Sequence, residues 1–96
     1  MREVVIMPRA RRQIERAMAW WHQHRDKAPE AFEDDLSSAI AAIAENAGTG
    51  AIVRRGPPAV RRLLLPRIHY CVYYRVHENT VEVISLWHAS RRQPHL

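Results

Sequence analysis

The fold is decided by the stretch IHYCVYYRV-HENT-VEVISL, residues 68–86, in which two apolar runs flank four polar residues. The runs consist largely of Val, Ile and Tyr, which favour the pleated, half-buried surface of a β-sheet. Asn79 tolerates a positive φ better than most residues, so Glu78-Asn79 predicts a tight hairpin turn. A third run, Val60–Leu65, precedes Pro66-Arg67, a second predicted turn. The last third of the chain therefore predicts a β-meander.

The alternation of side chains assigns faces to these strands, because successive residues of a strand point to opposite sides of the sheet. The set expected to face a helical layer is Ile68, Tyr70, Val72, Tyr74 and Val76. The set expected to face outward, toward a groove, is His69, Cys71, Tyr73, Arg75 and His77. Val81–Leu86 is apolar on both faces, which is typical of an interior strand. Arg61 and Arg62 are adjacent in a strand and should point to opposite faces.

The first third of the chain predicts a strand followed by a helix. Glu3–Met7 is a short apolar run, interpreted as a central strand with two apolar faces. Pro8 suits the first turn of a helix. The helical stripe that follows consists of Ala10, Ile14, Ala17, Met18 and Trp21. Trp20 lies off this stripe, and two interpretations stay open: packing at the helix edge, or exposure for a partner.

A second helix is predicted after the polar stretch His22–Lys27, with Pro29 at its first position and Gly48 as its stop. Its apolar stripe consists of Phe32, Leu36, Ala39, Ile40, Ile43 and Ala47. The short linker favours an antiparallel helical hairpin. Ala51–Val53 allows a brief strand, whereas Pro57-Pro58 cannot continue a ladder. The predicted fold is α+β in the order β-α-α-β-β-β, one domain over residues 1–96, with the hairpin covering one face of an antiparallel sheet.

Composition indicates an acidic partner. The 96 residues carry a net charge of +5, and 14 of the 15 basic residues are Arg, whose planar fork grips carboxylate or phosphate. Cys71 is the sole cysteine, which excludes an intrachain disulfide and predicts a buried, inert thiol. Six scattered His residues show no zinc spacing, and we expect no metal and no cofactor. No apolar leader opens the chain, so we expect a cytoplasmic protein without membrane contact.

Four segments carry a resemblance to a known family: Val60-Arg61-Arg62-Leu63, Tyr70–Val76, Val81–Ile84 and Leu86–Arg92. In this order and spacing they resemble the ParE/RelE superfamily of type II toxin–antitoxin toxins, and its ParE branch more closely. The resemblance implies a toxin of a plasmid-stabilisation module that is neutralised by a cognate antitoxin, in a complex that can be a hetero-oligomer. ParE-like members act on DNA gyrase by binding, whereas RelE-like members cut messenger RNA on the ribosome.

The resemblance also suggests site residues. The expected target-binding residues are Arg61, Arg62, Arg75, His88, Arg91 and Arg92. The expected antitoxin-binding residues are Trp20, Tyr73 and Arg75. The competing interpretation of His88, Arg91 and Arg92 is a solvated basic tail.

An enzymatic alternative stays open beside the binding one. A ribonuclease would use His88 and Arg91 with Arg61 and Arg62, supplying a base and cations for RNA cleavage. However, two RelE-like arginine positions fall on Cys71 and Ala89, and no Tyr follows them near the end of the sequence. This favours the ParE branch. A third alternative is a nucleic-acid-binding module without toxicity.

Overall fold

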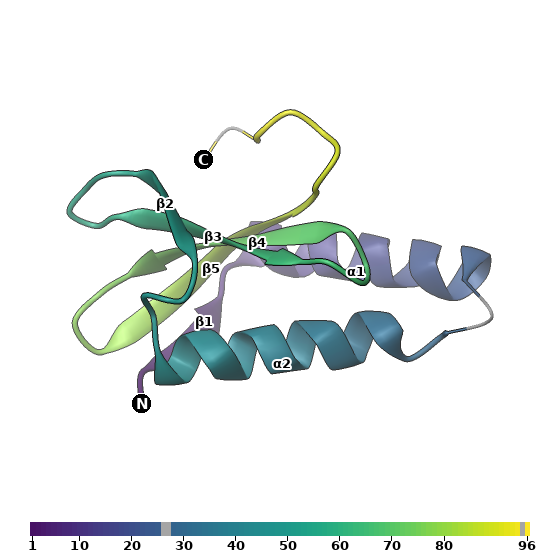
Figure 1. Cartoon of the computed structure of the whole chain (residues 1–96), viewed down its shortest axis with the longest axis horizontal. Coiled ribbons are helices and arrows are strands. Elements are labelled where there is room, and N and C mark those ends of the chain that lie inside the picture. The colour runs from purple at the N-terminus through teal and green to yellow at the C-terminus, as the bar shows by residue number, and fades with distance from the viewer. Residues whose placement is uncertain (26–27, 95) are drawn as a thin grey trace.

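The computed structural model describes residues 1–25, 28–94 and 96, and it has the predicted α+β architecture (Figure 1). The elements are β1 (Glu3–Ile6), α1 (Pro8–His24), α2 (Ala31–Glu45), β2 (Ala51–Arg54), β3 (Val60–Leu65), β4 (Tyr70–Val76) and β5 (Thr80–His88). The predicted succession of one strand, two helices and a meander is confirmed, and the brief strand allowed at Ala51–Val53 is present as β2, which makes the full order β-α-α-β-β-β-β.

The five strands form one sheet in the order β1-β5-β4-β3-β2. β5 is an interior strand, as predicted, and the three contacts among β2, β3, β4 and β5 are antiparallel. β1 lies parallel to β5 at the edge, with Val4 opposite Val81. The prediction of a central first strand was therefore wrong. Within β1, Val4 and Ile6 are partly buried against the core, while Val5 is 39% exposed, so the strand packs on one face alone.

The main core lies between the helical hairpin and one face of the sheet, as Figure 1 shows. The predicted stripes are confirmed: every member is buried except Met18 and Ile40, which are partly buried and pack on the same cluster. From the sheet, Val72, Tyr74, Val81, Val83 and Leu86 complete this core. The helix-facing set predicted for β4 is thus confirmed, since Ile68, Tyr70 and Val76 also pack there.

The helix ends differ in part from the predictions. Pro8 opens α1 as expected. α2 begins at Ala31 rather than Pro29, so the proline lies before the first turn and Glu33 and Asp34 meet the positive end of the helix dipole. The helix ends at Glu45, so Gly48 is not its stop, and no described glycine has a positive φ. Asp26 and Lys27, part of the predicted linker, lie outside the described residues.

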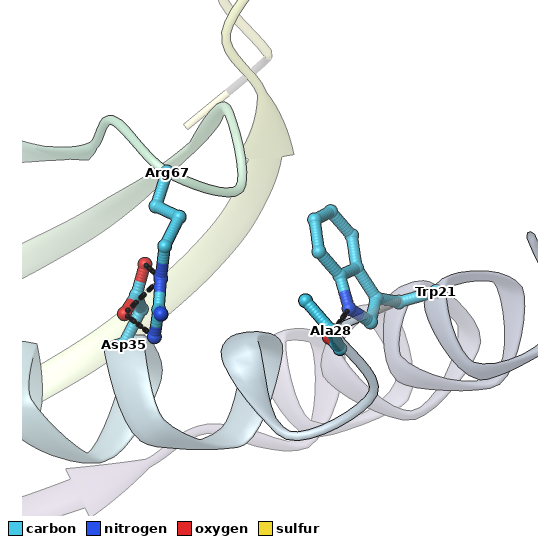
Figure 2. A network of polar contacts seen from close by, with 4 residues as sticks. All are labelled: Trp21, Ala28, Asp35 and Arg67. Carbon is cyan, nitrogen blue, oxygen red and sulfur yellow. Dashed lines mark hydrogen bonds and ion pairs between the residues drawn. The ribbon is translucent and has the colours of Figure 1, made fainter. Parts of the chain in front are cut away.

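Two polar contacts hold the connecting end of the helical hairpin and tie α2 to the sheet (Figure 2). Trp21 Nε1 donates a 2.8 Å hydrogen bond to the carbonyl oxygen of Ala28, closing the interhelical linker. Arg67, in the β3–β4 turn, pairs with Asp35 of α2 through Nε and Nη2, the latter at 2.7 Å from Oδ1. This hydrogen-bonded pair raises the pKa of Arg67 and keeps it charged.

Both predicted turns are present, but the residue with a positive φ is His69 and not Asn79. The β4–β5 hairpin is closed by a 2.8 Å bond from His77 N to Thr80 O. Asn79 does not adopt a positive φ; among the described non-glycine residues only His69 does, with φ of 62° in the β3–β4 turn. The prediction for Asn79 was therefore wrong, because that hairpin closes without a left-handed residue.

The sheet face away from the helices carries a second apolar cluster of Val60, Cys71, Tyr73 and Ile84. Trp87, near the end of β5, packs against it, and so do Ala89 and Leu96, because the chain after β5 crosses back over this face (Figure 1). Cys71 is buried, as predicted, and burial raises the pKa of its thiol. The set predicted to face outward in and around β4 therefore differs in exposure. Cys71 and Tyr73 are covered, whereas His69 and His77, which flank the strand, are exposed.

Candidate functional site

A groove lies where α1 passes the carboxyl-terminal end of β5. We call it the α1–β5 groove; it has a volume of about 540 Å³. Its lining residues are Gln13, Arg16, Ala17, Trp20, Tyr70, Leu86, Trp87, His88, Ser90 and Arg91. Three of these, Trp20, His88 and Arg91, are predicted site residues. The structure therefore brings part of the predicted site together on one side of the sheet.

The groove exists because β5 continues past the end of β1. The last residue of β1, Ile6, pairs with Val83, and β5 runs on to His88. Here Gln13 of α1 replaces the missing strand: its Oε1 accepts hydrogen bonds from Leu86 N at 2.9 Å and Ser85 Oγ at 3.1 Å. Since the backbone N–H of Leu86 can only donate, the amide orientation is set, and the Gln13 nitrogen keeps its two donors for the groove.

His88 is held in one tautomer by the turn that follows β5. Its Nδ1 accepts a 3.2 Å hydrogen bond from Ser90 N and lies 2.7 Å from Ser90 Oγ. Because the Ser90 N–H is an obligatory donor, Nδ1 carries no proton, and the neutral ring bears its proton on Nε2. The Tyr70 ring meets His88 edge-on, with centroids 5.1 Å apart, so the imidazole is held from two directions.

Arg91 is placed by the same turn, in which Arg91 N donates to His88 O at 3.0 Å. Its guanidinium carbon lies 5.3 Å from the centre of the Trp87 ring, a cation–π contact. Trp87 Nε1 in turn donates a 2.7 Å bond to Arg92 O. This turn places His88 and Arg91 on the same groove.

The helical wall of the groove is formed by one face of α1. Arg16 and Trp20 lie four residues apart, the spacing that places side chains above one another on a helix. Trp20 is 44% exposed in the chain alone, and a partner that covers it stays a prediction. Its ring stacks on His24 with centroids 4.5 Å apart, and the Arg25 guanidinium lies 5.4 Å from it. The exposed Trp20 ring at the rim thus contacts two neighbouring side chains.

The remaining predicted residues lie elsewhere. Arg61 Nη1 donates to Gly50 O at 2.6 Å and Gly48 O at 3.3 Å, so it ties β3 to the loop before β2. Arg62 is exposed, and Tyr73 is only 3% exposed, within the second cluster. In the free chain Tyr73 therefore does not line an open groove.

Arg75 belongs to a separate ionic cluster. Its Nε lies 3.0 Å from Glu82 Oε1, the cross-strand neighbour, and His77 Nε2 lies 2.8 Å from the same oxygen. The hydrogen bond from His77 and the charge of Arg75 lower the pKa of Glu82. The structure thus gives Arg75 an intramolecular partner at the far end of β4 from the groove.

Gln13, Arg16 and Tyr70 are groove residues that sequence reasoning missed as site residues. The spacing Gln13, Arg16, Ala17, Trp20 is a helical stripe beside the core stripe, and it was a readable signal. The sequence could not show that the end of β5 lies against this stripe of α1.

Two absences complete the description. Among residues 1–25, 28–94 and 96, no group of three or more His, Cys, Asp or Glu side chains is placed to hold a metal ion. No helix within the described part of the chain is long and apolar enough to cross a membrane.

Comparison with known proteins assigns the chain to a family. Residues 4–93 match the family model described as the ParE toxin of the type II toxin–antitoxin system parDE. A solved structure, titled as the chromosomal ParDE toxin–antitoxin system from P. aeruginosa, matches with a TM-score of 0.74. The alignment is 18% identical and covers 94% of this chain and 98% of that one, which shows a shared fold. No curated protein sequence matches. The family match spans nearly the whole sequence, and the chain belongs to the ParE toxin family of type II toxin–antitoxin systems.

Proposed function

We propose that this ParE-family toxin acts by binding DNA gyrase, and that a cognate ParD-type antitoxin neutralises it. The observation that carries the proposal is the family match over residues 4–93, together with a groove that gathers His88 and Arg91. The match supports a toxin paired with an antitoxin, and the groove supplies a surface on which binding can occur. We infer gyrase as the target because the chain resembles the ParE branch of the superfamily, whose members act on gyrase.

The chemistry of the groove suits binding to an acidic protein surface. Arg91 offers a guanidinium held by Trp87, and His88 offers Nε2–H. Holding these donors in place before binding lowers the entropy cost of forming each contact. The overall charge of +5 favours encounter with acidic partners and makes association faster at low salt.

The RNA-cleaving alternative is disfavoured by the placement of its residues. In the sheet Arg61 of β3 lies opposite Tyr74 of β4, and His88 of β5 lies opposite Tyr70, four residues earlier in β4. Four residues of a strand span about 13 Å, and Arg61 is not among the residues that line the groove with His88. Arg61 is also engaged with two backbone carbonyls. Binding without bond cleavage accounts better for this arrangement.

A plain nucleic-acid-binding module is also disfavoured. Both helices bury their apolar stripes against the sheet, and α1 directs Trp21 into the core. Neither helix stands forward as a recognition helix would.

The proposal is tested by inducing the chain alone in a bacterial host and measuring plasmid supercoiling and transcript integrity in the same cells. We expect growth arrest, relaxed or broken DNA and intact transcripts. Co-expression of the antitoxin should restore growth. Cleaved transcripts with normally supercoiled DNA would assign the protein to the ribonuclease branch and refute the gyrase proposal.

A further inference from the structure

The α1–β5 groove is lined by hydrogen-bond donors and by no carboxylate. Among the residues described there, Arg16 and Arg91 supply two guanidinium groups, and none is Asp or Glu. Gln13 adds its amide nitrogen, since its oxygen is taken by Leu86 N and Ser85 Oγ. His88 adds Nε2–H, since its Nδ1 accepts from Ser90. The groove lining therefore contains two cations and no anionic group, and an anion from a partner would balance it.

Beside these donors lies an apolar surface. Ala17 and Leu86, both buried members of the main core, contribute to the groove lining. The indoles of Trp20 and Trp87 and the ring of Tyr70 extend it. A ligand that fits must therefore pair a negative charge with an apolar portion. A space of about 540 Å³ accommodates a few amino-acid side chains.

We propose that the α1–β5 groove binds an acidic segment of the antitoxin, with one carboxylate held by Arg16 and Arg91. An adjoining aliphatic side chain of the same segment packs on Ala17 and Leu86. Arg and carboxylate pair through parallel hydrogen bonds, which are among the strongest in proteins. The proposal rests on the proposed function, because it names the site at which the neutralising partner binds.

A protein segment fits this groove better than a nucleic acid does. A phosphodiester backbone is polar along its length and would gain nothing from covering Ala17 and Leu86. Base stacking, the other common source of affinity for single strands, needs free aromatic faces. Here His24 stacks on the Trp20 ring and the Arg91 guanidinium lies over the Trp87 ring, which leaves less aromatic surface for bases.

The location also gives a mechanism of neutralisation. His88 and Arg91 are among the residues expected to contact the target, and they line the same groove. An antitoxin segment bound there covers them. Neutralisation then occurs by direct occlusion, and it needs no change in the fold of the toxin.

The test is the affinity of the purified toxin for its purified antitoxin, measured by titration calorimetry. We expect Arg16→Gln and Arg91→Gln each to weaken binding about 10- to 100-fold, the range for a lost hydrogen bond to a charged group. Arg91→Lys keeps a cation but loses the planar fork, and it should fall between wild type and Arg91→Gln. Arg11→Gln is the matched control: Arg11 is exposed on α1 outside the groove lining, and it should bind like wild type.

A double-mutant cycle identifies the carboxylate. Each Asp and Glu of the antitoxin is changed to its amide and titrated against wild type and Arg16→Gln. One amide change should weaken binding to wild type about tenfold or more and leave binding to Arg16→Gln nearly unchanged. Circular dichroism melts of each variant separate loss of binding from loss of folding.

Three other outcomes would overturn the proposal, each in a distinct way. Wild-type affinity in the Arg16→Gln, Arg91→Gln double variant would show that the antitoxin binds elsewhere, with the proposed function intact. No antitoxin binding by the wild-type toxin would refute the proposed function and this site together. If the double variant kept its antitoxin affinity but lost affinity for a 20-nucleotide RNA, the groove would be a nucleic-acid site instead.

Discussion

Gln13 and Leu86 are joined by a 2.9 Å hydrogen bond, although 73 residues separate them in the chain. The bond runs from the backbone N–H of Leu86, in β5, to a side-chain oxygen of α1. It occurs beyond the end of β1, where β5 has no strand partner on that side. One side chain thus completes the sheet hydrogen bonding and forms a wall of the α1–β5 groove.

Replacing Gln13 tests this double role. Gln13→Ala leaves the N–H of Leu86 and the hydroxyl of Ser85 without their acceptor. An unsatisfied buried donor costs about 1–3 kcal/mol, so the free energy of unfolding in urea should fall by that amount. Gln23→Ala, at an exposed position of the same helix, is the control and should change it by less than about 0.5 kcal/mol. Equal losses in both variants would contradict the role given to Gln13.

The hydroxyl of Tyr74 makes a second buried link. It donates to Ala47 O at 2.9 Å and accepts from Gly50 N at 2.8 Å, so it joins β4 to the loop that follows α2. Tyr74→Phe should cost about 1–3 kcal/mol of unfolding free energy, because two buried backbone groups lose their partner. Tyr73→Phe is the control: the Tyr73 hydroxyl makes no such bond within the described part of the chain, and its loss should leave the free energy of unfolding nearly unchanged. Similar stabilities of the two variants would refute the assignment.

Gly50 and Gly48 form a matched pair in the same loop. A Cβ at Gly50 would lie 2.6 Å from the backbone oxygen of Arg62 and 2.7 Å from the Tyr74 hydroxyl. At Gly48 its nearest neighbour would be the Asn46 side chain at 3.3 Å. Gly50→Ala should therefore lower the free energy of unfolding by about 1–3 kcal/mol, as overpacking does, and Gly48→Ala should lower it by much less. Thermal and urea unfolding of both variants would measure the difference, and a more stable Gly50→Ala would contradict the structure.

Glu82 should make stability depend on pH in the acid range. Its folded-state pKa is lowered, by the hydrogen bond from His77 and by the charge of Arg75. A lowered pKa means that the stabilisation is present above the unfolded-state pKa and is lost as pH falls through the folded-state value. Glu82→Gln should therefore be less stable than wild type near neutral pH, and the difference should vanish in acid. A difference that persists unchanged at low pH would exclude this origin.

Arg91 and Arg92 should differ in their effect on toxicity. Arg91 lines the groove, whereas the contact made by Arg92 is through its backbone oxygen, which accepts from Trp87. Arg91→Ala should therefore reduce growth arrest strongly, and Arg92→Ala should reduce it less. Colony counts after induction, with toxin levels matched by immunoblot, measure the effect. Full toxicity of the double variant would refute the assignment of these arginines to the target site.

The sequence predicted the core better than the site, for a physical reason. Helical stripes and strand alternation are local signals, so the buried faces of α1, α2 and β4 could be derived from spacing alone. The edge position of β1 depends on which strand it pairs with, and its apolar run of Val4, Val5 and Ile6 looks the same in either place. The sequence did not indicate that His69 would be the residue with a positive φ, because other residues of the same turn could have adopted that conformation.

The site depends on the meeting of distant segments. His88 and Arg91 were found through a family resemblance, but Gln13 and Arg16 lie more than seventy residues earlier and join them only in the folded chain. Arg61 and Arg75 were predicted as site residues in the same way. The structure gives them intramolecular partners instead, two backbone carbonyls and Glu82 respectively.

The most direct test of the account is DNA supercoiling by purified gyrase in the presence of the purified toxin. The account predicts that supercoiling of relaxed plasmid decreases as toxin is added, that Arg91→Ala requires a higher concentration, and that the antitoxin restores activity. Unchanged supercoiling at a large molar excess of a toxin that still binds its antitoxin would contradict the account.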